Sequence, residues 1–188
     1  EEEIIARVHQ NLKADHPGLL TVIVPRHPTR GIEIVERLQP IDVKCAKRSS
    51  GEVVNAATDI YIADTMGELG LFFRLTEIAF MGKSLVPLGG QNPLEALRLN
   101  CAVLHGPHMM NFQWMSEQMI QQGCSRQIKD EAELTTAVAD LLTDASQRQN
   151  MIRQGQAFVD QHSQVIDLVA SEIEIILDKK FGAENAAA

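Results

Sequence analysis

The residues best suited to binding chemistry lie in the segment Ser84–Glu95, SLVPLGGQNPLE. Gly89 and Gly90 allow the backbone to adopt positive φ and let a ligand approach the main chain closely. Asn92 is a good helix N-cap, and Pro93 suits the first helical position, because an N–H there has no partner within the helix. The unpaired N–H groups of a helix start attract anions. A strand, a Gly-Gly turn and a capped helix are together typical of a phosphate-binding loop.

The same residues also fit an ordinary turn between a strand and a helix. In that interpretation Asn92 and Glu95 pair as a capping box and bind nothing else. The segment lacks the lysine of a P-loop and the G-x-G-x-x-G spacing of a dinucleotide-binding fold. Both interpretations stay open on these residues alone.

Two further candidates follow an earlier apolar run, Leu19–Val24. Arg26 is suited to phosphate binding, because a guanidinium can donate two parallel hydrogen bonds to one phosphate group. The alternative is an arginine that is merely exposed in a loop. His27 either donates a second hydrogen bond or braces the loop between Pro25 and Pro28.

Strands and helices are expected to alternate along the chain and to position these residues. Apolar runs predict strands, whereas apolar residues at helical spacing and the capping boxes Thr65-x-x-Glu68, Asp130-x-x-Glu133 and Asp144-x-x-Gln147 predict helices. The expected strands are Leu19–Val24, Ile41–Ala46, Asp59–Ala63, Ile78–Met81, Ala102–Leu104 and Cys124–Ile128. The expected helices cover residues 1–15, 29–38, 65–75, 94–99, 111–122, 130–142, 144–161 and 164–179.

This alternation predicts an α/β fold with a Rossmann-like, doubly wound parallel sheet. Ligands of such sheets bind beyond the carboxyl ends of the strands, where the polar and glycine-rich segments above would gather. A doubly wound unit usually opens on a strand, yet this chain opens on a helix. We therefore expect the first strand to be missing from residues 1–181, which form one domain followed by a small, polar tail at 182–188.

Composition further restricts the classes of function and ligand that fit this chain. Lys and Arg number 17 against 25 Asp and Glu, and the resulting net charge of −8 argues against nucleic-acid binding. The three cysteines form no C-x-x-C motif and are expected to be reduced thiols of a cytosolic domain. His105 and His108 lack an evident third ligand, so we expect no metal and no cofactor. No apolar run is long enough to cross a membrane, and no signal peptide is visible.

Six motifs in one order carry a family resemblance that covers essentially the whole chain. They are Val24-Pro25-Arg26-His27-Pro28, Arg48-Ser49-Ser50-Gly51-Glu52, Asp64-Thr65-Met66-Gly67-Glu68-Leu69, Ser84-Leu85-Val86, Gly89-Gly90-x-Asn92-Pro93-Leu94-Glu95-Ala96 and Gly106-Pro107-His108-x-x-Asn111-Phe112. Together they resemble the C-terminal half of the bacterial 3-deoxy-D-manno-octulosonic acid (Kdo) transferases of lipopolysaccharide synthesis. Two positions depart from the family pattern: Gln91 stands where histidine is usual, and Lys83 where glycine is usual.

The resemblance implies a GT-B glycosyltransferase, in which two Rossmann-like domains face each other across a cleft. This half would bind the donor, CMP-Kdo. The missing N-terminal domain would carry a membrane anchor, the site for a lipid A precursor and the catalytic carboxylate, so no catalytic residue is expected in this chain. The full-length enzyme would work at the cytoplasmic face of the bacterial inner membrane, and the fragment alone would be soluble and inactive.

The resemblance also implies nucleotide-binding roles for particular residues. Arg26 and His27 would contact the phosphate, and Glu95 the ribose hydroxyls. Backbone N–H groups of Met66 and Gly67 would bind the cytosine edge or the phosphate. The remaining candidates line the same rim: Ser49, Ser84, Gly89, Gly90 and Asn92.

Two other functions remain as alternatives. One is a non-catalytic ligand-binding module on a Rossmann-like scaffold. The other is a GT-B enzyme, including an epimerase, that uses another nucleotide sugar.

Overall fold

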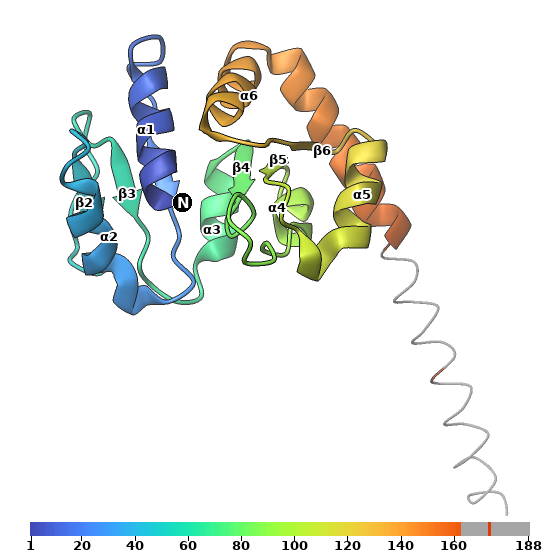
Figure 1. The fold of residues 1–188 in the computed structure, drawn as a ribbon, viewed down its shortest axis with the longest axis horizontal. Helices are drawn as coiled ribbons and strands as arrows, with labels where there is room; N and C mark the ends of the chain where they lie inside the picture. Colours follow the sequence, from blue (N-terminus) through green and yellow to red (C-terminus); the bar gives the residue numbers. More distant parts are fainter. Residues whose placement is uncertain (163–172, 174–188) are drawn as a thin grey trace, which may run out of the picture.

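A computed structural model describes residues 1–162 and residue 173 (Figure 1). Its six strands form two parallel sheets of three strands each, with the orders β1-β3-β2 and β4-β5-β6. The α/β class with parallel strands is therefore confirmed. The strands are β1 (Thr21–Ile23), β2 (Cys45–Lys47), β3 (Ile60–Ile62), β4 (Ile78–Met81), β5 (Ala102–His105) and β6 (Ser125–Gln127).

Helices separate the consecutive strands except β2 and β3, which are joined by a loop. The helices are α1 (Glu2–Lys13), α2 (Gly31–Leu38), α3 (Leu69–Leu75), α4 (Leu94–Arg98), α5 (Gln113–Gln121) and α6 (Glu131–Thr143), with 3₁₀ turns η1 (Pro28–Arg30) and η2 (Met110–Phe112). A further helix covers residues 145–162. The helix expected over 164–179 lies outside the described residues.

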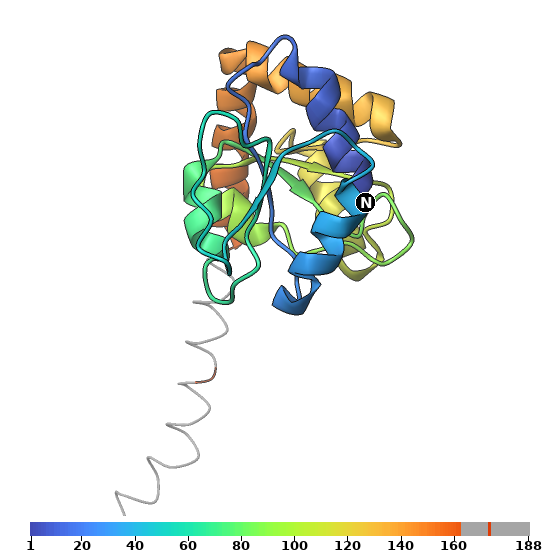
Figure 2. The same cartoon turned by 90° about the vertical axis from the view of Figure 1, so that its left-hand side faces the viewer.

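The first helix, α1, packs on both sheets and joins them. Val8 and Leu12 belong to the apolar cluster around Leu104 of β5, whereas Ala6 packs with Ile60 and Ile62 of β3. The side view shows α1 close to α6, which agrees with the many contacts between these two helices (Figure 2). One helix thus contributes side chains to the cores of both sheets.

The division into two sheets was not expected from the sequence. The doubly wound pattern predicts one sheet, but β1 and β4 each pair with a single neighbour and not with each other. The strands are also shorter than expected: the run Ile41–Ala46 yields only Cys45–Lys47. Just ahead of β2 the regular ladder is replaced by other hydrogen bonds: Lys44 O accepts from both Asp59 N and Ile60 N, and Lys44 N donates to the Asp59 carboxylate at 2.7 Å.

The predicted helix caps have mixed outcomes. Asp130 accepts a hydrogen bond from Glu133 N at 2.9 Å, and Asp144 accepts one from Gln147 N at 2.9 Å, so these two caps are confirmed. The box Thr65-x-x-Glu68 is wrong, because α3 begins only at Leu69 and has no side-chain cap. The Glu68 carboxylate instead binds the guanidinium of Arg48.

Most apolar residues pack as a core, and the cysteines join it. Cys101 and Cys124 are buried free thiols, and burial raises the pKa of each to about 11. Met109 and Met119 are buried, whereas Trp114 and Met110 are largely exposed. Within the described residues, no helix is long and apolar enough to cross a membrane.

Candidate functional site

The strand register brings the polar loops of the first sheet together. Ile62, the last residue of β3, is paired with Ile23 of β1 on one side and with Lys47 of β2 on the other. The loops that begin with Val24, Arg48 and Ala63 therefore leave the sheet side by side at its carboxyl edge. The second sheet does the same for the loops after β4 and β5, because Met81 is paired with His105.

Arg26 and His27 are exposed at the end of the loop that follows β1. Among the described residues, neither side chain takes part in a hydrogen bond or an ion pair. The guanidinium is therefore free to bind an external anion, and the imidazole can add a second donor. This is the arrangement that the candidate phosphate role requires.

Asp64 holds the loop after β2 in place beside β3. Its buried carboxylate accepts hydrogen bonds from Ser49 N at 2.8 Å and from Ser49 Oγ at 2.7 Å. A Cβ added at Gly31, the first residue of α2, would lie only 2.1 Å from Asp64 Oδ2. The hydroxyl of Ser49 is thus used in a hydrogen bond within the protein. Asp64, which follows β3, contacts both the loop after β2 and the start of α2. Sequence reasoning did not assign this role to Asp64.

The turn after β3 presents unused backbone donors. Met66 is 76% exposed, Gly67 adopts φ +81°, and no hydrogen bond from either N–H occurs in the described part of the chain. The turn is held at Glu68, whose carboxylate accepts from Arg48 Nε at 2.5 Å and from Thr65 Oγ1. These hydrogen bonds lower the pKa of Glu68 to about 2. A fixed turn with free N–H groups can bind a phosphate or the edge of a base.

The Gly89–Gly90 turn interlocks with the loop after β5. Both glycines have positive φ, at +89° and +75°, and both are buried. An added Cβ would lie 2.4 Å from Asn111 Nδ2 at Gly89 and 2.3 Å from Met109 Sδ at Gly90. In addition, Gly90 N donates to Lys83 O, and Gly89 O accepts from Asn111 N. Packing between the two loops therefore already requires both glycines, apart from any ligand.

Ser84 organises the same region from inside. Its fully buried hydroxyl donates to Met81 O and accepts from Gly106 N at 2.7 Å, and its carbonyl accepts from His108 N. The Glu1 carboxylate accepts from the N–H groups of Ser84 and Leu85 at 2.9 and 2.7 Å. The hydroxyl of Ser84 is thus engaged within the protein.

Lys83 has a backbone conformation that suits the glycine usual at this position in the family pattern. Its φ of +61° lies in the left-handed region, which costs a residue with a Cβ about 1–2 kcal/mol. A glycine at this position adopts the same backbone without that penalty.

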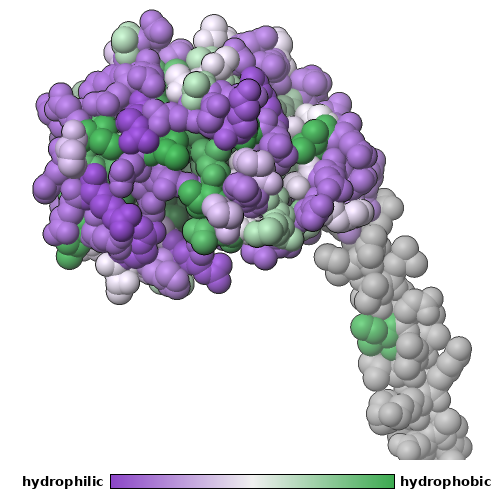
Figure 3. Space-filling view, in the orientation of Figure 1, coloured by the Kyte–Doolittle hydropathy of each residue, from purple (hydrophilic) through white to green (hydrophobic). Residues whose placement is uncertain are grey.

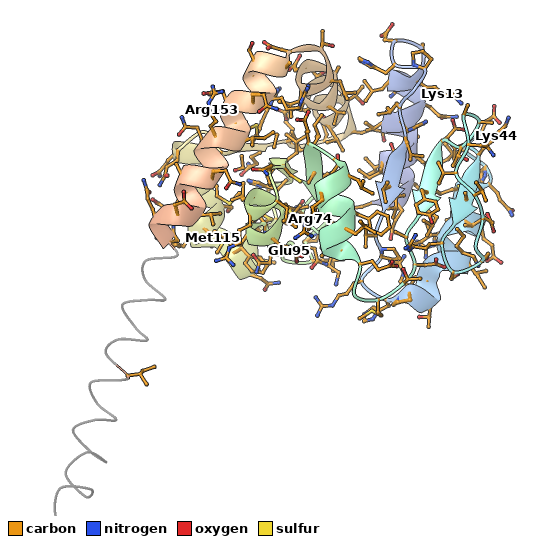
Figure 4. The ribbon with its side chains drawn as sticks, turned by 180° about the vertical axis from the view of Figure 1, so that it is seen from behind. Lys13, Lys44, Arg74, Glu95, Met115 and Arg153 are labelled. Atoms are coloured by element: carbon orange, nitrogen blue, oxygen red, sulfur yellow. The ribbon has the colours of Figure 1, made fainter. Side chains whose placement is uncertain are left out.

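Asn92 and Glu95, predicted to form one capping box, have different contacts. Asn92 Oδ1 accepts from Leu94 N at 3.0 Å, but Asn92 is not the N-cap that the sequence predicts, because the five-residue helix α4 begins at Leu94 with Pro93 as its N-cap and without a side-chain cap. Glu95 makes no reciprocal capping bond. A Cβ added at Gly70 would lie 3.1 Å from Glu95 Oε1 and 3.2 Å from Arg74 Nη1, so both side chains lie beside Gly70. Figure 4 shows Glu95 and Arg74 next to each other on neighbouring helices. The exposed Glu95 carboxylate has no hydrogen bond or ion pair in the described residues and faces α3.

His105, the last residue of β5, is buried, whereas His108 in the following loop is partly exposed. His105 is fully buried, with Nδ1 2.9 Å from Gly106 O and Nε2 3.3 Å from Ser125 Oγ, and burial lowers its pKa. Its role is therefore in packing. The described residues contain no cluster of three His, Cys, Asp or Glu side chains that would hold a metal ion.

Comparisons with known proteins give a consistent picture. No family model matches the chain. The chain is 36% identical over 152 residues to the 3-deoxy-D-manno-octulosonic acid transferase of Haemophilus influenzae and 30% identical over 169 residues to that of Rickettsia bellii. These matches cover 80% and 89% of the chain but only 36% and 40% of the relatives, so the chain spans less than half of their length.

A solved structure is similar over most of both chains. The crystal structure of the C-terminal CMP-Kdo binding domain of WaaA from Acinetobacter baumannii superposes with a TM-score of 0.79 at 30% identity. The match covers 84% of this chain and 83% of that domain.

Proposed function

This chain belongs to the Kdo transferase family, and we propose that it binds the donor CMP-Kdo as the C-terminal domain of an inverting glycosyltransferase. The observation that carries the proposal is the similarity to a CMP-Kdo binding domain over 83% of that domain's length. The free donors at the carboxyl edge of the strands support it, because they match an anionic nucleotide.

Each part of the donor has a matching group in the loops. The guanidinium of Arg26 and the ring of His27 bind the phosphate. The Met66 and Gly67 N–H groups bind the cytosine edge or the phosphate, and Glu95 accepts from the ribose hydroxyls. The loop residues Ser49, Ser84, Gly89, Gly90 and Asn92 shape the rim, with their own polar groups largely engaged within the protein.

In the reaction, a hydroxyl oxygen of a lipid A precursor attacks the anomeric carbon of Kdo. The bond from that carbon to the phosphate oxygen breaks, CMP leaves with the electron pair, and the acceptor's proton passes to a carboxylate base outside this chain. Arg26 stabilises the negative charge that grows on the departing phosphate. The acceptor site, the base and the membrane contact belong to the part of the relatives that this chain does not span.

A calorimetric titration with three nucleotides tests the proposal. We expect the chain to bind CMP more tightly than UMP or UDP. Preference for UDP would favour an enzyme or epimerase that uses another nucleotide sugar. Absence of binding to all three would favour a non-catalytic module and contradict the proposal.

A further inference from the structure

Two oppositely charged side chains, Arg74 of α3 and Glu95 of α4, meet beside Gly70. The point where a Cβ of residue 70 would stand is 3.1 Å from Glu95 Oε1 and 3.2 Å from Arg74 Nη1, so the two charged groups lie close to each other. They form no direct ion pair in the part of the chain that the structure describes. Figure 4 shows both side chains together, on the two neighbouring helices. Arg74 is therefore placed to act on Glu95 through charge.

Arg74 is restrained by its own helix. Its Nη1 donates to Gly70 O at 2.9 Å, one turn earlier in α3. Arg74 also lies in the last turn of α3, where the negative end of the helix dipole favours a cation. The Glu95 carboxylate, in contrast, accepts no hydrogen bond among the described residues. A restrained positive group thus lies beside a carboxylate that still has its bonding capacity.

Gly70 leaves the space in which these two side chains meet. Its backbone is helical and has no positive φ, so the conformation alone does not require glycine. A methyl group at this position would contact Glu95 and Arg74 more closely than a Cβ normally does, and Leu99 Cδ1 lies 3.7 Å from the same point. A side chain at residue 70 would therefore push Glu95 or Arg74 away from its present place.

Charge at the surface does not by itself indicate a role. Hydrophilic residues cover most of the face drawn in Figure 3, and exposed ion pairs add little to stability. Arg74 and Glu95 are also exposed. Their proximity matters more for a ligand, because a long, free side chain loses rotamer freedom when it binds. A neighbouring positive charge that already orients the carboxylate lowers this cost.

We propose that Arg74 is a positioning residue that orients the Glu95 carboxylate toward the ribose of the nucleotide, with Gly70 leaving room for both side chains. This role rests on the proposed function, because it requires Glu95 to accept hydrogen bonds from the ribose hydroxyls. Arg74 acts through Glu95 and does not touch the nucleotide. Its contribution is therefore confined to ligands that carry those hydroxyls.

Calorimetric titration with CMP and with 2′,3′-dideoxy-CMP, which lacks both ribose hydroxyls, tests the proposal. The ratio of the two dissociation constants measures the ribose contact. We expect Arg74→Gln to lower this ratio about threefold, in keeping with the small energy of an exposed ion pair, and to leave the affinity for 2′,3′-dideoxy-CMP unchanged. Arg153→Gln is the matched control: it removes an exposed arginine on the helix over 145–162 and should not change the ratio (Figure 4).

Two further variants separate binding from folding. Gly70→Ala should also lower the ratio, because the added methyl group displaces Glu95, whereas the thermal midpoint should hold or rise, since alanine favours a helix over glycine. In the Glu95→Gln background, Arg74→Gln should not lower the ratio further, because the carboxylate that it orients is gone.

The outcomes distinguish this role from the proposed function. CMP binding with an unchanged ratio in Arg74→Gln or Gly70→Ala would overturn the role of Arg74 and leave the proposed function intact. An equal fall in affinity for both nucleotides in Arg74→Gln would also overturn it, since Arg74 would then act on the phosphate or on the fold. Equal binding of the two nucleotides by the wild type would overturn the ribose contact of Glu95 together with the role of Arg74.

Discussion

Arg48 and Glu68 form a two-point ion pair that ties the loop after β2 to the turn before α3. The same guanidinium lies 3.4 Å from the Tyr61 hydroxyl and 5.7 Å from the centre of the Phe72 ring. The pair therefore fixes the turn in which Met66 and Gly67 present their free N–H groups. Both partners are about one-third exposed, so salt weakens the attraction between them.

The Glu68 pKa predicts how stability depends on pH. Hydrogen bonds from Arg48 and Thr65 lower this pKa from 4.5 to about 2 in the folded chain. A carboxyl group with a depressed pKa stabilises the fold fully above its unfolded value and loses that effect as pH falls. We expect Glu68→Gln to remove part of the decline in thermal midpoint between pH 4.5 and 2. An identical decline in both proteins would contradict the prediction, and Glu36→Gln, an exposed change on α2, is the control.

Packing around Gly90 predicts a loss of stability on adding one methyl group. Gly90→Ala combines a positive φ with a Cβ 2.3 Å from Met109 Sδ. We expect a loss of about 2–4 kcal/mol in the free energy of unfolding, from backbone strain and overpacking together. Gly123→Ala shares the positive φ but has open space, so it should cost only about 1–2 kcal/mol. Equal losses in urea titrations would show that the two loops do not interlock.

Local sequence patterns predicted the elements well and their long-range partners poorly. The β-branched run around Thr21–Ile23 does form a strand, since side-chain preference acts locally. The split between β1 and β4 was missed, because no local pattern records which strands pair. Glu68 was predicted to cap a helix, but Arg48, 20 residues earlier, competes for the same carboxylate.

The candidate site was predicted only in part, again because local sequence patterns do not record tertiary contacts. Arg26, Met66 and Glu95 are exposed and unengaged, as binding groups should be, and their contacts with a nucleotide remain predictions. Ser84 looked similar in sequence, yet burial commits its hydroxyl to Met81 and Gly106. Burial and tertiary hydrogen bonds thus separate candidates that composition alone treats alike.

Arg26 is predicted to contribute to nucleotide affinity and not to folding. Arg26→Gln should weaken CMP binding by roughly 10- to 100-fold, because hydrogen bonds to charged groups contribute about 1.5–3 kcal/mol. The thermal midpoint should not change, since the side chain is exposed and without a partner in the described residues. Arg153→Gln is the control, because Arg153 lies on the helix over 145–162, away from the sheet that carries Arg26 (Figure 4). Equal affinities for Arg26→Gln and wild type would refute phosphate binding.

Asn92→Asp tests whether the start of α4 faces the phosphate. Aspartate offers the same acceptor to Leu94 N, and its charge is favourable near a helix start, so stability should hold or rise slightly. A carboxylate near the phosphate would repel it, with a cost of about 1 kcal/mol at 4 Å in water and more where water is excluded. We therefore expect CMP affinity to fall at least fivefold at low salt, and less at high salt. Unaltered CMP affinity would restrict Asn92 to its hydrogen bond with Leu94 N.

Glu95→Gln separates ribose binding from a structural role. The carboxylate accepts no capping bond and has no ion pair in the described residues, so its neutral replacement should leave the unfolding temperature unchanged. A ribose diol needs two acceptors, and glutamine offers one acceptor and one donor. Because charge-assisted hydrogen bonds are about twice as strong as neutral ones, CMP affinity should fall by roughly 1–3 kcal/mol. Cytosine and inorganic phosphate should bind Glu95→Gln and wild type equally, since neither carries ribose. An unfolding temperature that shifts while CMP affinity stays constant would show that Glu95 supports the fold and does not bind the donor.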